Sequence, residues 1–272
     1  MKDWRRLQFY FALSLLCATL AAALLSLFWT PFPLDDTSGG RLEPPGVPHL
    51  LGTDRLGRDL LSFVLVGTRI AYTVGLGATL IAALAGISVG IAAAWLPEWL
   101  DNTVSSFLDI LIAFPTLLLA MLIGAAQGRG TWTAVVSIGI ACSAIIARLT
   151  RILAKQIMSK AFFTSALTSG TSPLRITFIH IFPNIWQVLA VNLAVIFGLS
   201  ILAEASLSYL GLGVPPPNAS LGRLMQEAQS TVFTSPLGAV VPGVVIVAIV
   251  LGVNLLADSV RDKAGRSGGL SQ

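Results

Sequence analysis

The sequence contains very little charge: 17 lysines and arginines and 13 aspartates and glutamates among 272 residues, which is 11% in all. Hydrophobic residues make up 55% of the chain, and its mean hydropathy is +0.82. So few charges cannot cover a water-soluble protein of this size, whereas lipid accepts apolar side chains on the outside of every helix. The composition therefore excludes an ordinary soluble domain and predicts an integral membrane protein.

Cysteine and histidine are equally scarce. The two cysteines, Cys17 and Cys142, both lie within apolar runs, which is typical of small buried residues and not of a disulfide framework. The two histidines, His49 and His180, are far apart in the sequence, and there is no H-E-x-x-H motif. We therefore expect no metal site in this chain.

Motifs for nucleotide chemistry and proteolysis are missing as well. There is no G-x-x-x-x-G-K-[ST] phosphate loop, so any ATP chemistry has to come from a partner. An intramembrane aspartyl protease needs two facing acids, and the candidates, Asp109 and Glu204, fall near the ends of apolar runs, where side chains reach water. The basic residues are not interleaved with aromatic ones, which argues against nucleic-acid binding. We predict no catalytic residue and no enzyme activity in this chain.

Long apolar runs are what the sequence does contain. A helix needs about 20 apolar residues to cross a bilayer. Six such runs are present, at residues 7–29, 70–95, 104–126, 132–148, 185–209 and 237–257. Pro115 interrupts the third run and predicts a kink there. The first run is longer than the apolar part of a signal peptide, about 7 to 15 residues, so we expect an uncleaved span. The predicted fold class is an all-α membrane protein with six transmembrane helices.

The distribution of basic residues predicts the orientation of these spans. If the N-terminus is cytoplasmic, eleven basic residues lie on the inner side: Lys2, Arg5, Arg6, Arg148, Arg151, Lys155, Lys160, Arg175, Arg261, Lys263 and Arg266. The six on the outer side share it with six acids, so we expect both termini in the cytoplasm. The predicted segments are a cytoplasmic tail with the first span (1–29), an outer loop with a surface helix (30–69), a five-span core (70–257) containing an inner loop (151–184), and a cytoplasmic tail (258–272).

The inner loop carries the most informative stretch, SKAFFTSALTSGTSPLRITFIHIFPN at residues 159–184. Phe163 and Leu167 can share one helical face, Gly170 predicts the end of that helix, and an apolar surface resumes before Pro183. An apolar face in a cytoplasmic loop has to be covered. Either it packs against the protein's own spans or the membrane surface, or it is a docking helix for a soluble partner.

Two stretches on the outer side combine turn-forming residues with charge. The first is a motif of six residues, Gly52, Thr53, Asp54, Gly57, Arg58 and Asp59, in which ion pairs could fix a short helix at the membrane surface. Its alternative role is contact with a solute or a delivery protein. The second follows the fifth span and includes Glu204, Leu210, Gly211, Gly213 and Pro216. We interpret it as gate architecture, because its prolines end the span and redirect the chain.

These stretches together resemble the permeases of ABC importers. The inner loop is similar to their coupling segment, E-A-A-x-x-x-G followed by an apolar turn and a proline, at Ala166, Gly170 and Pro183. Thr164 and Ser165 stand where the family has glutamate and alanine, so a charged contact is missing. LGTDRLGRDLLSFVLVGTRIA (51–71), FLDILIAFPTLLLA (from Phe107), LAEASLSYLGLGVPPPNASLG (202–222) and LLADSVRD (from Leu255) resemble the second permease of the peptide and nickel branch.

The resemblance implies a type I ABC importer fold in a bacterial cytoplasmic (inner) membrane. It also implies a homologous second permease, two ABC ATPase subunits that bind ATP and Mg, an extracytoplasmic solute-binding protein and surrounding lipid. No cofactor is expected on this chain. The solute would be a di- or oligopeptide, taken up by alternating access, with nickel or a metal chelate as the alternative. A membrane receptor or scaffold without transport is the rival class.

Overall fold

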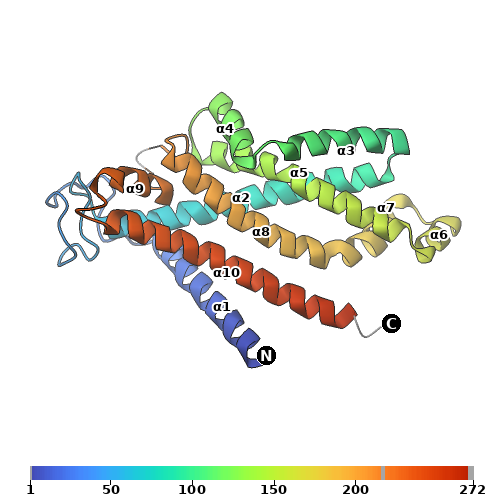
Figure 1. Cartoon of the computed structure of the whole chain (residues 1–272), viewed down its shortest axis with the longest axis horizontal. Helices are drawn as coiled ribbons and strands as arrows, with labels where there is room; N and C mark the ends of the chain where they lie inside the picture. Colours follow the sequence, from blue (N-terminus) through green and yellow to red (C-terminus); the bar gives the residue numbers. More distant parts are fainter. Residues whose placement is uncertain (1, 216–217, 269–272) are drawn as a thin grey trace.

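The computed structural model describes residues 2–215 and 218–268, and the regular structure within them is helical (Figure 1). Five helices are long and apolar enough to cross a membrane: α1 (Lys2–Leu25), α2 (Leu60–Trp95), α5 (Thr131–Met158), α8 (Phe182–Tyr209, extended at its start by shorter elements) and α10 (Leu237–Gly268). A bent pair, α3 (Glu98–Ala113) and α4 (Thr116–Gln127), raises the number to six if it is one span. The all-α membrane fold is confirmed.

The third apolar run is broken and not merely kinked. Helices α3 and α4 meet at an angle of 90°. Phe114 and Pro115 lie between them in extended backbone conformations. A proline disfavours the helical conformation of the residue before it and lacks a backbone donor, so the helix ends at Ala113 and restarts at Thr116.

Helices α2 and α5 form the closest pair in the bundle. Four small residues of α2 follow one another at intervals of four: Ala78, Ala82, Gly86 and Gly90. A Cβ atom added to Gly90 would lie 2.5 Å from the carbonyl oxygen of Ala147 in α5. Small residues at such spacing let two backbones approach, which is how membrane helices associate where lipid offers no hydrophobic driving force. This pair is the rigid centre of the structure.

The bundle is elongated and has two distinct ends (Figure 1). The α9 end consists of the 26–59 segment and α9 (Leu221–Ala228), which is followed by the short 3₁₀ helix η2 (Gln229–Thr231). The α6 end, at the opposite side, carries α6 (Ala161–Thr168) and the turn that joins α2 to α3. The start of α1 and the end of α10 lie away from the 26–59 segment.

Two sequence predictions about the 30–69 segment are wrong. No surface helix forms between residues 26 and 59, where the chain makes turns and one isolated bridge between Thr53 and Asp59. Helix α2 begins at Leu60 and not near residue 70, because Asp59 caps it by accepting a hydrogen bond from the Ser62 backbone N–H. Arg69, which ends the apolar run in the sequence, donates to the Ser26 carbonyl oxygen at 2.9 Å and so fits within the helix.

The inner loop predicted at 151–184 is shorter in the structure. Helix α5 continues to Met158, and α7 (Pro173–Ile176) passes through a π-helical turn, η1 (Thr177–Ile181), directly into α8. Pro183 therefore lies in the first turn of α8 within one continuous helical stretch and does not end the loop. Only residues 159–172, with α6 in their middle, separate the two spans.

Candidate functional site

Helix α6 ends in a hydrogen-bonded cap built on Gly170. The Gly170 N–H donates to the carbonyl oxygen of Leu167 at 3.0 Å, and the Thr171 N–H donates to that of Ala166 at 3.2 Å. This pair of bonds is the Schellman motif, which needs a residue in the left-handed region. Gly170 has φ +78° and nothing within 4 Å of a Cβ position. The predicted helix break at Gly170 is confirmed.

One face of α6 is anchored to the bundle by aromatic packing. Phe163 is only 8% exposed, and its ring lies 5.7 Å from that of Trp95 at the end of α2. The Trp95 indole nitrogen donates to the Thr177 hydroxyl at 3.0 Å, which links α2 to η1. Ile157 of α5 and Ile176 of α7 belong to the same buried cluster. Helix α6 therefore packs on a cluster to which α2, α5 and α8 all contribute.

The other face of α6 is open. Phe162 and Leu167 are 42% and 41% exposed, and Thr164 and Ser165 are exposed as well. Ala166 is half-buried and packs against the cluster that contains Phe163. Four of the five residues predicted for the coupling segment (Thr164, Ser165, Ala166 and Gly170) therefore lie together on α6 and its cap, whereas Pro183 lies in α8.

A buried carboxylate supports the end of α5 from which α6 departs. Asp101, in the first turn of α3, is 1% exposed. It accepts hydrogen bonds from Arg151 at 2.5 and 2.7 Å and from the Lys155 ammonium. A more exposed pair, Arg148 with Asp109 at 3.1 Å, joins the same two helices. We call Asp101, Arg151 and Lys155 the Asp101 cluster.

Sequence reasoning missed the Asp101 cluster. Asp101 lies in the turn before the third apolar run, and Arg151 and Lys155 are one helical turn apart at the end of the fourth. The i, i+4 spacing of the two basic residues was the available signal, since it places both on one face of a helix. Nothing in the sequence says that α3 folds back beside that face.

At the α9 end, Arg58 joins the predicted outer motif to α9. Its guanidinium pairs with Asp54 at 2.6 Å and with Glu227 of α9 at 2.5 Å, and Glu227 also accepts from Arg223 at 2.8 Å. Burial lowers the pKa of Arg58, but the hydrogen bonds and charges of Asp54 and Glu227 outweigh it and raise that pKa overall. The predicted ion pair within the motif is present, although no helix carries it.

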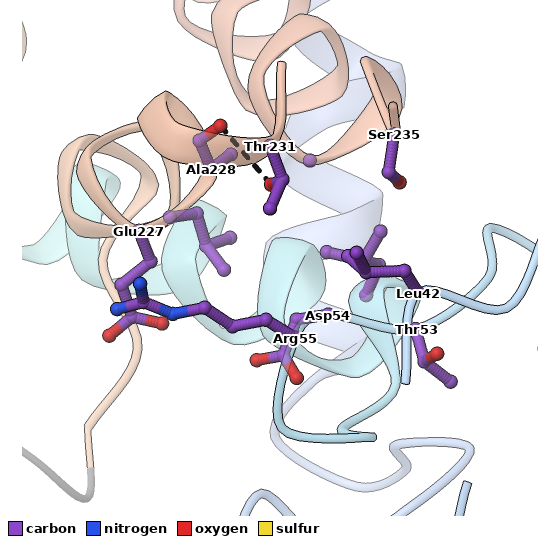
Figure 2. Close-up of a pocket in the computed structure, with 11 residues that line it drawn as sticks. Leu42, Thr53, Asp54, Arg55, Glu227, Ala228, Thr231 and Ser235 are labelled. Carbon is purple, nitrogen blue, oxygen red and sulfur yellow. Dashed lines mark hydrogen bonds between the residues drawn. The ribbon is translucent and has the colours of Figure 1, made fainter. Parts of the chain in front are cut away.

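The remaining residues of the outer motif fix the loop itself. Thr53 accepts a hydrogen bond from the Glu43 N–H at 2.9 Å, and buried Asp59 contacts His49 at 3.0 Å. Gly52 and Gly57 both have positive φ and close turns of this loop, with their N–H groups donating to the carbonyl oxygens of His49 and Asp54. A small pocket remains where this loop meets α9 and the start of α10; it includes Thr53 and Asp54 on one side and Glu227, Thr231 and Ser235 on the other (Figure 2).

Glu204 was expected near water, and the structure instead buries it. The side chain is 1% exposed, and its Oε1 accepts from the Ser208 hydroxyl at 2.7 Å and from the Ser220 hydroxyl at 2.8 Å. Since Ser220 precedes α9, this carboxyl ties α9 to α8. Leu210 caps α8, and Gly211 and Gly213 follow it in the turn. Pro216, predicted as part of the same motif, lies outside the described residues.

The ionisable side chains of the site serve packing between segments of the chain. Among residues 2–215 and 218–268, no group of three or more His, Cys, Asp or Glu side chains is placed to hold a metal ion. Two groups of charged side chains join separate segments: Asp101 of α3 pairs with α5, and Arg58 of the 26–59 segment pairs with α9. At the α6 end, a short helix packs one face against the bundle and exposes the other.

Comparison with known proteins agrees with this architecture. The family described as binding-protein-dependent transport system inner membrane component matches residues 84–266. A putative peptide transport system permease protein of Brucella suis biovar 1 is 37% identical over 259 residues, which cover 95% of this chain and 87% of that protein. A glutathione transport system permease protein of Pectobacterium atrosepticum is 36% identical over 81% of this chain and 73% of its own length.

A solved structure shows the same fold. An inward-facing form of the MetNI methionine ABC transporter aligns with a TM-score of 0.63 and 15% identity, covering 74% of this chain and 95% of the matched chain. That likeness establishes the fold of a type I ABC importer membrane subunit. Together with the family match and relatives above 30% identity, it shows that the chain belongs to the binding-protein-dependent transport system inner membrane components, the permease subunits of ABC importers.

Proposed function

We propose that this chain is one of two permease subunits of an ATP-driven importer of peptides, with α6 as the helix that receives the movement of an ATPase. Relatives named for peptide, dipeptide and glutathione transport support the solute class. The single observation that carries the proposal is the construction of α6: one face buried through Phe163, the other open, and the helix closed by the Gly170 cap.

The charge distribution supports a cytoplasmic position for the α6 end. Exposed Lys160 and Arg175 flank α6 and carry no ion pair among the described residues. At the α9 end, the four arginines of the 26–59 segment and α9 share that end with six acids: Asp35, Asp36, Glu43, Asp54, Asp59 and Glu227. Positive charge gathers on the cytoplasmic side of membrane proteins, so α6 and both termini lie inside and α9 faces the solute-binding protein.

The proposed mechanism follows from the contacts between α6 and the bundle. Closure of the ATPases would push α6, and Phe163 and Trp95 would pass that movement to α2, α5 and α8. The spans would then exchange an inward-open for an outward-open packing, and hydrolysis in the partner would reset them. This subunit would do no covalent chemistry. Its task would be to keep the two packings close in free energy, so that ATP binding selects one.

The test is purification of the tagged chain in mild detergent after co-expression with its neighbouring genes, followed by ATPase assays and reconstitution into liposomes. We expect ATPase subunits and a second permease in the complex, and ATP-dependent uptake of labelled di- or oligopeptides when the binding protein is present. A chain that purifies without any nucleotide-hydrolysing partner would contradict the proposal and favour a receptor. A complex that takes up nickel and no peptide would correct only the solute.

A further inference from the structure

The part of the chain that carries α6 is positively charged and has no acid of its own, although exposed Glu98 lies in the first turn of α3 at the same end. Between residues 110 and 203 the sequence contains no aspartate or glutamate. Six basic residues fall in that stretch: Arg129, Arg148, Arg151, Lys155, Lys160 and Arg175. Arg148 pairs with Asp109 of α3, and Arg151 and Lys155 share the single carboxylate of Asp101. Lys160 and Arg175, one on each side of α6, are exposed and have no carboxylate within ion-pair distance in the described part of the chain.

Between these two charges α6 presents an apolar surface. Phe162 and Leu167 are the large exposed side chains of the helix. Two exposed hydroxyl groups lie beside them: Ser165 donates to the Ala161 carbonyl oxygen at 3.2 Å, and Thr168 donates to the Thr164 carbonyl oxygen at 3.2 Å. Their protons are therefore used, and they offer a partner no strong donor. The centre of this surface attracts apolar groups, and its rim attracts anions.

The surface continues past α6 onto the next helical turn. The Phe162 ring lies 6.0 Å from the ring of His180 in η1, and Phe178 and Ile179 beside it are more than half exposed. Because Phe163 and Trp95 hold α6 against the bundle, the surface is presented as a preformed shape. A preformed surface costs less ordering entropy when a partner binds.

We infer that the ATPase subunit that docks on this chain does so with an apolar groove rimmed by carboxylates that face Lys160 and Arg175. This inference rests on the proposed function, and it adds the chemistry of the partner's groove. An acid at position 164, as in the permeases that this chain resembles, would instead favour a basic groove. Here Thr164 removes that acid, and the only formal charges flanking α6 are positive. Complementary charge at a rim sets specificity and association rate, while the apolar centre supplies most of the affinity.

The test is a binding measurement between the complex lacking its ATPase subunits, held in nanodiscs of neutral lipid, and the purified ATPase. Lys160→Glu and Arg175→Glu are made singly and together, with Arg129→Glu as the matched control, because Arg129 is exposed next to the first residue of α5, at the far end of that helix. We expect the double variant to raise Kd about tenfold at low salt, since reversal turns two rim attractions into repulsions. The effect should shrink near 1 M salt, where the screening length is only about 3 Å.

Two further experiments test the apolar centre and the charged rim of the surface separately. Phe162→Ala should weaken binding to a similar extent at low and high salt, because an apolar contact is not screened. Replacing rim carboxylates of the ATPase by lysine should restore binding to the Lys160→Glu and Arg175→Glu double variant. Binding that is unchanged or tighter after charge reversal overturns the acidic rim. An effect seen only in nanodiscs with anionic lipid also overturns it, because the charges would then serve the membrane surface.

Failure of this inference is distinguishable from failure of the proposed function. If the unaltered chain binds no ATPase under any condition, the proposed function fails. If it binds the ATPase and the charge variants bind equally well, the coupling role of α6 stands and only the chemistry of the groove is wrong.

Discussion

Replacement of Gly170 by valine tests the coupling role of α6 most directly. Gly170 has φ +78°, a conformation that costs a residue with a side chain roughly 1–2 kcal/mol, and more when that side chain is β-branched. No atom lies within 4 Å of a Cβ at this position, so the change causes no clash and its cost is conformational only. The variant should therefore insert into the membrane and assemble normally.

The magnitude matters because α6 is short and buries one large side chain. An eight-residue helix is marginal by itself. The one large side chain that α6 buries, Phe163, is worth about 1.5–3 kcal/mol. A loss of about 1–2 kcal/mol at the cap is comparable to that term and lowers the ratio of capped to uncapped helix roughly 5- to 30-fold. We expect peptide uptake to fall at equal expression, by up to that factor.

The assay is uptake of labelled peptide into cells or liposomes, normalised to the amount of chain in the membrane, with ATPase activity measured in parallel. Gly170→Asn is the matched control, since asparagine tolerates the left-handed region and should retain most of the uptake. Full uptake by Gly170→Val would refute the coupling role of the cap. Equal loss in both variants would show that side-chain bulk at the docking surface, and not backbone conformation, is responsible.

Three further sets of substitutions test contacts that hold the segments of the chain together. Asp101→Asn should lower the stability of the purified subunit by about 1–3 kcal/mol, seen as a lower thermal unfolding temperature in detergent, because partly buried Arg151 loses its charged partner; Asp101→Glu should recover part of it. A double-mutant cycle of Arg58→Ala and Glu227→Ala should give a coupling energy of about 0.5–3 kcal/mol, and additivity would mean that the bridge does not hold α9. Gly90→Val should prevent accumulation in the membrane, because its Cβ would lie 2.5 Å from a carbonyl oxygen of α5; normal accumulation would disprove the tight α2–α5 contact.

The spans and the cap of α6 could be predicted because their causes are local. Length and apolarity suffice to define a membrane helix, and a glycine after a short amphipathic stretch suffices to end one. The predicted start of α2 was wrong because its cause is not local. Arg69 looks like the end of an apolar run, but the Ser26 carbonyl oxygen, 43 residues away in the chain, accepts its hydrogen bond and lets the helix begin earlier.

Glu204 is a single residue whose local sequence and tertiary surroundings predict different environments. From its position near the end of an apolar run, access to water was the natural expectation. The structure surrounds it instead with Ser208, one turn along α8, and Ser220, which reaches it from across the turn before α9. Only the return of the chain after α8 brings Ser220 there, and no periodicity in the sequence encodes that return.

The sequence by itself determined that this protein lies in a membrane, how many apolar helices it has to within the broken pair, and where α6 stops. Each of these depends on residues that are neighbours in the chain. The tertiary structure decided the burial of Asp101 between Arg151 and Lys155, and the attachment of α9 through Arg58 and Glu204. Those features pair groups that are 16 to 169 residues apart, and the partner of a charge is set by which helices lie side by side.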